Sequence, residues 1–558
     1  MSLPVLAAIF LITIGLGYRF YGRLVARQYA LNNNQRTPAH ELKDGVDFVP
    51  TKPFYLFGQH FSAISAAGPI AGPILACQQF GWLPCLLWIG LGVVLIGAVH
   101  DFSALIASVR HRGNSIAEII KLNIGHKAWL AILGFIWFAL LYVIVAFTDI
   151  TAATFVGRIE ELDGMQVGFE RGGAVAAAST MYLTLAILMG IIQKKWNPPL
   201  WLMTLVFVPA TLAVVWYGTE LAPYFLLSKK AWGGIILLYC LIASLLPVWF
   251  LLQPRGYLGG FVLYLTLAVG LIGIFLGGYP IQQIPFKGWQ AAGPTGSLFP
   301  FLFVTIACGA CSGFHGLVCS GTTSKQIDKE TDCRPVGYGA MLLEAFVALI
   351  ALATIIILSD NEIKGAPGAI FGQGIGRFLT LVIGKENLVF AITFGAMAFS
   401  TFVFDTLDVT TRLGRYILQE LTGKKGPVSA TLATLATVGV PALLIGIAPE
   451  GGWLHFWILF GTANQLLAAL TLLGITVWLY RSGKRYWFTL LPMLFVGTIT
   501  LWSFISQLTN SYQLGLTEGF HLDIRLINGI VTLTLVTLAI FILLNAVRSL
   551  RIKRSTSS

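Results

Sequence analysis

Charged residues are scarce in this chain, and their scarcity sets its class. Only 11% of its 558 residues are Asp, Glu, Lys or Arg, whereas 56% are hydrophobic. This excludes an array of soluble domains, because such domains carry about 25% charged residues. Apolar runs long enough to cross a bilayer recur along the whole sequence. The composition therefore predicts an all-α polytopic membrane protein.

Motifs for energy supply and catalysis are missing as well. No G-x-x-x-x-G-K-[ST] occurs, which argues against direct use of ATP, and no H-E-x-x-H, which argues against a zinc protease. The seven cysteines lie mostly in apolar segments and form no secreted disulfide framework. Cys308 and Cys311 have C-x-x-C spacing without the strand–helix context of a redox motif. We expect neither enzyme activity nor a cofactor.

Apolar runs separated by charged residues or by Gly and Pro give about fifteen segments. They lie near residues 4–22, 56–77, 82–109, 128–157, 174–193, 199–217, 231–252, 257–277, 298–320, 337–359, 388–410, 428–448, 452–480, 486–507 and 526–548. Most of the 36 Lys and Arg fall in alternate loops, which the positive-inside rule assigns to the cytoplasm. This predicts an amino terminus outside and a carboxyl terminus inside. The net charge of +12 is then explained by the basic residues of the cytoplasmic loops, and it does not indicate a nucleic-acid partner.

The stretch FGQHFSAISAAGPIAGPILA (57–76) combines an apolar run with two Gly-Pro pairs. Proline has no N–H and clashes with the carbonyl four residues back, so Pro69 and Pro73 free two carbonyls. In hydrocarbon, such groups are tolerated only where protein buries them or a ligand meets them. We expect unwinding between about Ser65 and Pro73 and a substrate site there; the alternative is a packed proline kink. The candidate residues are His60, Ser65, Gly68, Pro69 and Gly72.

In LFPFLFVTIACGACSGFHGLVCSGTTSKQ (298–326), polar residues recur at steps of three and four, the spacing of one helical face. They are Thr305, Cys308, Ser312, His315, Cys319 and Thr322. Ordinary helix packing explains most of the hydroxyl and thiol groups. An ionisable ring among glycines is instead a functional candidate. We expect Ser312 and His315 to bind substrate and Thr322 to take part in ion coupling.

Carboxyl groups within apolar segments are further candidates, because they are costly near the bilayer centre unless paired or hydrated. Asp101, Glu344 and Asp408 are predicted to couple an ion. Asp408 can also form a salt bridge with Arg412, four residues later on the same helix. The roles of two more carboxyl groups stay open: Asp149 and Asp405.

Several of these stretches together resemble the carbon starvation protein A (CstA) family. The resemblance rests on the two segments quoted above and on GAVHDF, SLLPVWFLLQPRGYL, ETDCRPVGYGAMLLEAFVA, LDVTTRLGRYILQEL and FGTANQLLAAL. The family comprises prokaryotic inner-membrane transporters linked to uptake of peptides or of pyruvate with protons. The resemblance adds Pro73 and Arg412 to the candidate residues above. The chain departs from the family pattern at Gln59 and His100.

The same resemblance implies a LeuT-like core of two inverted five-helix repeats with discontinuous helices. The core then spans 56–420, with repeats at 56–217 and 231–420. An extra helix and a cytoplasmic loop (1–55) precede the core, and accessory helices and a cytoplasmic tail (421–558) follow it. Pro247 is expected mid-helix in the segment opening the second repeat, freeing the carbonyl of Ala243. A seven-plus-seven arrangement is also allowed, because an odd number of helices per repeat again gives two inverted halves. In that arrangement the second and ninth segments are equivalent.

The expected function is secondary active import of small carboxylates such as pyruvate, or of short peptides, by proton symport. Histidine titrates near physiological pH, so His60 and His315 suit a carboxylate ligand or a proton step. Sodium coupling through backbone carbonyls and hydroxyls is the rival mechanism. A membrane sensor that binds without transport is a different class of function, and it would be expected to carry a signalling domain. The expected partners are the small-molecule substrate and the lipid bilayer.

Overall fold

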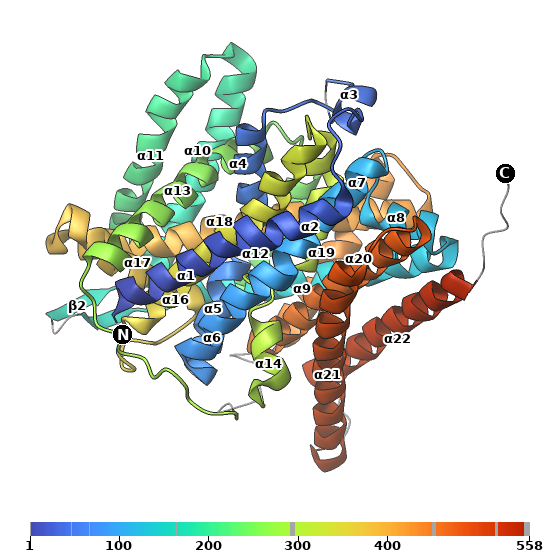
Figure 1. The fold of residues 1–558 in the computed structure, drawn as a ribbon. Coiled ribbons are helices and arrows are strands. Elements are labelled where there is room, and N and C mark those ends of the chain that lie inside the picture. The colour runs from blue at the N-terminus through green and yellow to red at the C-terminus, as the bar shows by residue number, and fades with distance from the viewer. Residues whose placement is uncertain are drawn as a thin grey trace.

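Long apolar helices make up most of the structure, a computed structural model that describes residues 2–45, 47–65, 67–162, 165–290, 296–448, 453–518 and 523–551 (Figure 1). Within these residues, twelve helices are long and apolar enough to cross a membrane, and one bent pair raises the number to thirteen. The polytopic all-α class is therefore confirmed. The predicted count of about fifteen spans is not, because two predicted segments are too short or interrupted in the structure.

The elements follow one another as a nearly uninterrupted series of helices. The α-helices are α1 Leu3–Leu16, α2 Gly22–Tyr29, α3 Pro38–Glu41, α4 Pro53–Ile64, α5 Gly68–Phe80, α6 Trp82–Gly92, α7 Ala98–Arg110, α8 Ile116–Asn123, α9 His126–Thr154, α10 Arg171–Trp196, α11 Leu200–Leu221, α12 Lys229–Leu245, α13 Leu252–Leu276, α14 Leu298–Thr305, α15 Gly313–Gly321, α16 Ala340–Ile356, α17 Pro367–Ile383, α18 Leu388–Thr422, α19 Pro427–Ile447, α20 Trp453–Arg481, α21 Trp487–Glu518 and α22 Ile524–Arg551. Short π-helical segments adjoin three groups of these helices: η1 Gly17–Tyr21, η2 Val93–Gly97 and η6 Arg334–Gly339. Short 3-10 helices are η3 Ala222–Phe225, η4 Thr323–Lys325, η5 Glu330–Asp332 and η7 Lys385–Asn387. The strands β1 Ile159–Leu162 and β2 Met165–Phe169 pair antiparallel between α9 and α10.

The first interruption lies between α4 and α5, whose axes differ by 46°. It begins at Ser65, as predicted from the Gly-Pro pairs, but ends before Gly68. The predicted unwinding to Pro73 is therefore too long. Pro69 lies in the first turn of α5, where a missing N–H costs nothing, and Pro73 is accommodated inside the helix.

The second interruption divides the predicted segment 298–320 into α14 and α15. Residues 306–312 between them are not helical, so the prediction of one continuous helical face is wrong. Thr305 ends α14, and Ser312 precedes the first residue of α15. The two interruptions fall in the second and ninth predicted segments, the pair related by the seven-plus-seven alternative. Both repeat arrangements and their boundaries remain predictions.

The short helix α12 accounts for the other missing span. It has 17 residues and ends at Leu245, so Pro247 lies beyond the helix rather than in its middle. The carbonyl of Ala243 accepts a hydrogen bond from Arg412 Nη2 at 2.9 Å, and the same nitrogen donates to Leu246 at 2.8 Å. The carbonyl that the sequence predicts to be free therefore has a side-chain partner from α18.

Figure 1 shows how the ends of these helices are distributed. The amino terminus, β2 and the end of α14 lie on one side of the bundle, and α3 and α8 lie on the opposite side. The interior between them is apolar, with aromatic side chains such as Trp457, Tyr142 and Tyr338 buried. The polar groups described next lie inside this apolar core.

Candidate functional site

The two interrupted segments contact each other closely, and glycine makes the contact possible. A Cβ on Gly72 would lie 2.6 Å from the carbonyl oxygen of Thr305, and one on Gly68 would overlap Sγ of Cys308. Because no side chain stands between them, α5 passes directly against the break that separates α14 from α15. Gly68, Pro69 and Gly72, which the sequence predicts to bind substrate, thus lie on the helix that contacts the second break.

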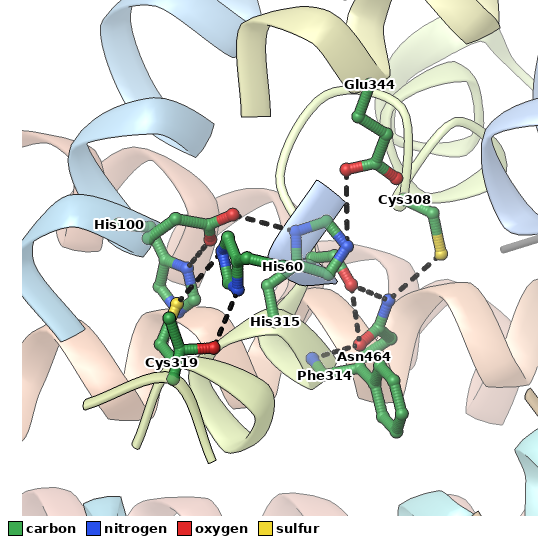
Figure 2. Close-up of polar contacts among 11 residues, drawn as sticks. His60, His100, Cys308, Phe314, His315, Cys319, Glu344 and Asn464 are labelled. Carbon is green, nitrogen blue, oxygen red and sulfur yellow. Dashed lines mark hydrogen bonds and ion pairs between the residues drawn. The ribbon is translucent and has the colours of Figure 1, made fainter. Parts of the chain in front are cut away.

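His315, in the first turn of α15, lies between two carboxyl groups from other helices (Figure 2). Its Nδ1 is 2.9 Å from Oδ2 of Asp101 on α7, and its Nε2 is 3.3 Å from Oε2 of Glu344 on α16. All three side chains are buried. The contact with Glu344 is an ion-pair contact rather than a complete hydrogen bond, because neither Glu344 oxygen has a hydrogen-bond partner among the described residues.

Asp101 has a second imidazole on its other oxygen. Nδ1 of His100, the preceding residue, lies 2.7 Å from Oδ1 of Asp101. Each oxygen of this carboxylate therefore faces a ring nitrogen. The predicted ion-coupling residues Asp101 and Glu344 thus lie in one cluster with the predicted substrate residue His315, and His100 joins them. We call these four side chains the histidine cluster.

His60, on α4, lies beside the histidine cluster and has different partners. Its Nδ1 is 2.9 Å from Oγ1 of Thr323, and its Nε2 is 3.8 Å from Sγ of Cys319. The predicted coupling residue Thr322 is not brought to this place. Its side chain is exposed to the surface and its hydroxyl donates to the carbonyl of Val318 in the preceding turn. The neighbouring Thr323 takes the buried position.

Ser65 and Ser312 lie at the ends of the two interruptions. Both are buried, and the Ser65 hydroxyl has no hydrogen-bond partner among the described residues. Ser312 accepts a hydrogen bond from Nδ2 of Asn464 at 3.0 Å. Ser65 therefore has an unused buried hydroxyl beside the last turn of α4, whose final carbonyls have no partner further along the helix.

Three side chains of α20 satisfy the broken ends of α14 and α15. Nε1 of Trp457 donates to the carbonyl of Thr305 at 3.1 Å, and Nε2 of Gln465 to that of Phe303 at 2.9 Å. Oδ1 of Asn464 accepts from the backbone N–H of Phe314 at 2.9 Å and so caps α15. Sequence analysis missed these roles. The available signal was the polar pair Asn464-Gln465 within an otherwise apolar segment.

A second charge cluster, in which Arg255 and Asp408 are buried and Asp405 is partly exposed, joins α13 to α18. Arg255 lies 2.5 Å from Oδ1 of Asp405 and 2.7 Å from Oδ2 of Asp408, which also accepts a hydrogen bond from Tyr239 at 2.8 Å. We call these four side chains the arginine cluster. The predicted salt bridge between Asp408 and Arg412 is wrong, because Arg412 donates to the carbonyls that end α12 and Asp408 pairs with another helix. Asp149 pairs with Lys229 at 2.9 Å.

Comparison with known proteins gives consistent matches to one family. The family described as carbon starvation protein CstA matches residues 2–369 and 362–503. The peptide transporter CstA of Helicobacter pylori is 34% identical over 566 residues, covering 88% of this chain and 79% of that protein. The pyruvate/proton symporter BtsT of Escherichia coli is 32% identical over 583 residues, covering 87% and 79%. Among solved structures, a manganese transporter of Eremococcus coleocola aligns with a TM-score of 0.46 and 14% identity, over 89% of this chain and 95% of its own. That likeness is too low to assign a fold.

Proposed function

This chain belongs to the carbon starvation protein CstA family, and from that premise we propose that it imports short peptides or a small carboxylate such as pyruvate by proton symport. Its relatives are named as transporters, and the chain is a multi-pass membrane protein like them. We further propose that it lies in a prokaryotic inner membrane with its amino terminus outside and its carboxyl terminus in the cytoplasm.

The observation that carries proton coupling is the position of His315 between Asp101 and Glu344. Two ionised carboxylates and one protonated imidazole leave this buried cluster with one negative charge. A buried unpaired charge is costly, so the cluster favours binding of one further cation. A proton is well suited to this role because imidazole and carboxyl groups exchange it directly, and histidine titrates near physiological pH.

The interruptions next to the histidine cluster suit a carboxylate ligand. Both α5 and α15 begin at the breaks, so their amino-terminal ends, which carry partial positive charge, face the same region. Ser65 and Ser312 provide hydroxyl groups there. Peptides and pyruvate share a carboxylate, and we propose that this group binds at the helix ends while the histidine cluster carries the coupled proton.

Sodium coupling is the second candidate, and one observation favours it. The unpartnered hydroxyl of Ser65 lies beside the carbonyls that end α4, and hydroxyl and carbonyl oxygens are ligands that transporters use for Na⁺. The two mechanisms differ in which ion gradient drives uptake.

The test uses the purified full chain in proteoliposomes with labelled pyruvate or di-alanine. Proton and sodium gradients are imposed separately, and counterflow at equal pH is measured alongside gradient-driven uptake. We expect a proton gradient to drive uptake. His315→Gln should abolish uptake against a gradient while counterflow persists, because glutamine keeps polarity and approximate size but cannot titrate. Uptake driven by sodium alone, or unchanged coupling in His315→Gln, would contradict the proposal.

A further inference from the structure

His100 has one ring nitrogen that the histidine cluster does not use. Its Nδ1 faces Asp101, whereas its Nε2 is buried and has no partner among the described residues. The hydroxyl of Thr471 on α20 is likewise buried and unpartnered. A buried polar atom without a partner costs free energy, so two such atoms in one region call for an explanation.

Gly316 brings these two groups to a common space. A Cβ built on Gly316 would lie 3.4 Å from Nε2 of His100 and 3.4 Å from Cγ2 of Thr471. The absence of a side chain on Gly316 lets the imidazole of His100 and the methyl group of Thr471 approach the α15 backbone closely, and any space between these side chains is small. Buried water occupies sites of this kind, where it satisfies otherwise unpaired polar groups.

A row of buried hydroxyl groups continues from this space along α7 and α15. The hydroxyl of Ser320 donates to the carbonyl of Gly316 at 2.7 Å and accepts from the backbone N–H of Ile116 at 3.2 Å. One turn further on, Ser108 and Ser324 lie 2.8 Å apart, and the Ser108 hydroxyl also reaches the carbonyl of Asn114 at 2.7 Å. All three serines are buried.

The row ends at the turn between α7 and α8. Asn114 is partly exposed in this turn, and Arg112 is exposed. Figure 1 places this end of α7 with α3 and α8, the side that the sequence predicts to be cytoplasmic. Polar groups thus extend from Asp101, deep in the core, to one surface of the protein.

We propose that His100, a water molecule held between it and Thr471, and the hydroxyls of Ser320, Ser324 and Ser108 form the route by which the coupled proton leaves Asp101. The proposal rests on the proposed proton symport. His100 receives a proton at Nδ1 from Asp101 and releases one from Nε2 to the water, so the ring stays neutral while its own proton moves from Nε2 to Nδ1. Rotation of the ring then restores the starting tautomer before the next transfer. Because the Ser320 hydroxyl donates to the carbonyl of Gly316, the route requires further water to connect it to the hydroxyls of Ser324 and Ser108.

The charged surroundings of His100 support a relay role. The titratable groups near it are Asp101 on its own helix, His315 and His60 from α15 and α4, and Glu344 from α16; α20 contributes the hydroxyl of Thr471. The carboxylate of Asp101 links the two imidazoles of His100 and His315. A proton can therefore pass between them without a change in the net charge of the four side chains.

The experiment measures substrate entry and proton entry separately in proteoliposomes that contain a trapped pH dye. His100→Gln should lower substrate-driven proton entry at least about a hundredfold relative to counterflow measured on the same vesicles, the scale of a lost proton-transfer group. Ser108→Ala combined with Ser324→Ala should slow proton entry and change its solvent isotope effect. Ser103→Ala is the matched control, a buried serine on the same helix outside the row.

The results separate this proposal from the proposed function. If His315→Gln uncouples transport but His100→Gln and the double serine variant keep the wild-type proton-to-substrate ratio and pH profile, the route is wrong and the symport stands. If His315→Gln is also fully coupled, the proposed function itself fails. Should His100→Gln fold poorly, the double serine variant, which leaves the histidine cluster intact, decides the question.

Discussion

The histidine cluster and the arginine cluster share an arrangement of two carboxylates around a central base, and they differ in that base and in their fourth member, His100 or Tyr239. Each surrounds one basic side chain with two carboxylates from other parts of the chain: Asp101 and Glu344 around His315, and Asp405 and Asp408 around Arg255. Guanidinium stays charged at every physiological pH, whereas imidazole gains and loses its proton. The base of the first cluster can therefore change its charge during a transport cycle, whereas the base of the second keeps its charge.

The backbone around each cluster matches this difference. His315 begins α15 directly after a break, and two glycines bring α5 against that break. Arg255 and Asp408 are each 1% exposed and join α13 to α18, a continuous helix of 35 residues. We infer that the histidine cluster acts where the backbone is free to rearrange, and that the arginine cluster holds two long helices together.

The largest effect should come from removing the base of the arginine cluster. Arg255→Met leaves the buried carboxylate of Asp408 without its cation, and breaking a buried pair in this way costs about 3–5 kcal/mol. We expect a clear fall in the thermal unfolding temperature of the protein in detergent. The double variant Arg255→Met with Asp408→Leu should recover most of it. A single variant as stable as the wild type would refute the structural role of the cluster.

A smaller effect, on coupling rather than stability, should separate the acids of the two clusters. Glu344→Gln removes a titratable group beside His315, so we expect the number of protons moved per substrate to fall. Asp408→Asn should leave that number unchanged, because the permanent charge of Arg255 favours the ionised form of Asp408 throughout the cycle. The ratio is measured from parallel proton and substrate fluxes in proteoliposomes. An equal fall in the proton-to-substrate ratio in both variants would show that the two clusters do not differ in proton coupling.

The smallest effect concerns the edge of the histidine cluster. Thr323→Val removes the hydroxyl partner of His60, and loss of one such hydrogen bond costs about 1 kcal/mol. We expect a modest loss of stability and a change in substrate KM. Thr322→Ala, one residue earlier, should be close to neutral, because its exposed hydroxyl bonds only to its own helix. The opposite order of effects would place Thr322 rather than Thr323 at the site.

Local chemistry explains which parts of the fold could be predicted. The spans follow from long apolar runs, and the break at Ser65 follows from prolines that cannot donate a hydrogen bond. The break between α14 and α15 has no comparable signal, because the polar residues keep helical spacing across it. Its ends are instead satisfied by Trp457, Asn464 and Gln465 of α20, whose proximity depends on tertiary packing.

Prediction of the candidate site from local sequence meets the same limit, because its residues come together only through tertiary packing. Asp101, Glu344 and His315 could each be chosen as candidates from the sequence, because ionisable groups in apolar segments cost free energy and are therefore rare. Their assembly around one imidazole could not be read from the sequence, because Asp101 lies 214 positions from His315. Where local spacing did offer a partner, as with Asp408 and Arg412, it was misleading, since Asp408 pairs with Arg255 and Arg412 donates to backbone carbonyls instead.

The distribution of thiols has a practical consequence. Six of the seven cysteines are buried, and Cys308 alone is partly exposed, in the break beside Gly68 and within 3.4 Å of Nδ2 of Asn464. A membrane-impermeant maleimide should consequently label the unmodified protein at one position in this conformation. The labelling rate from each face of the membrane then reports which way the central break opens, and bound substrate should slow it.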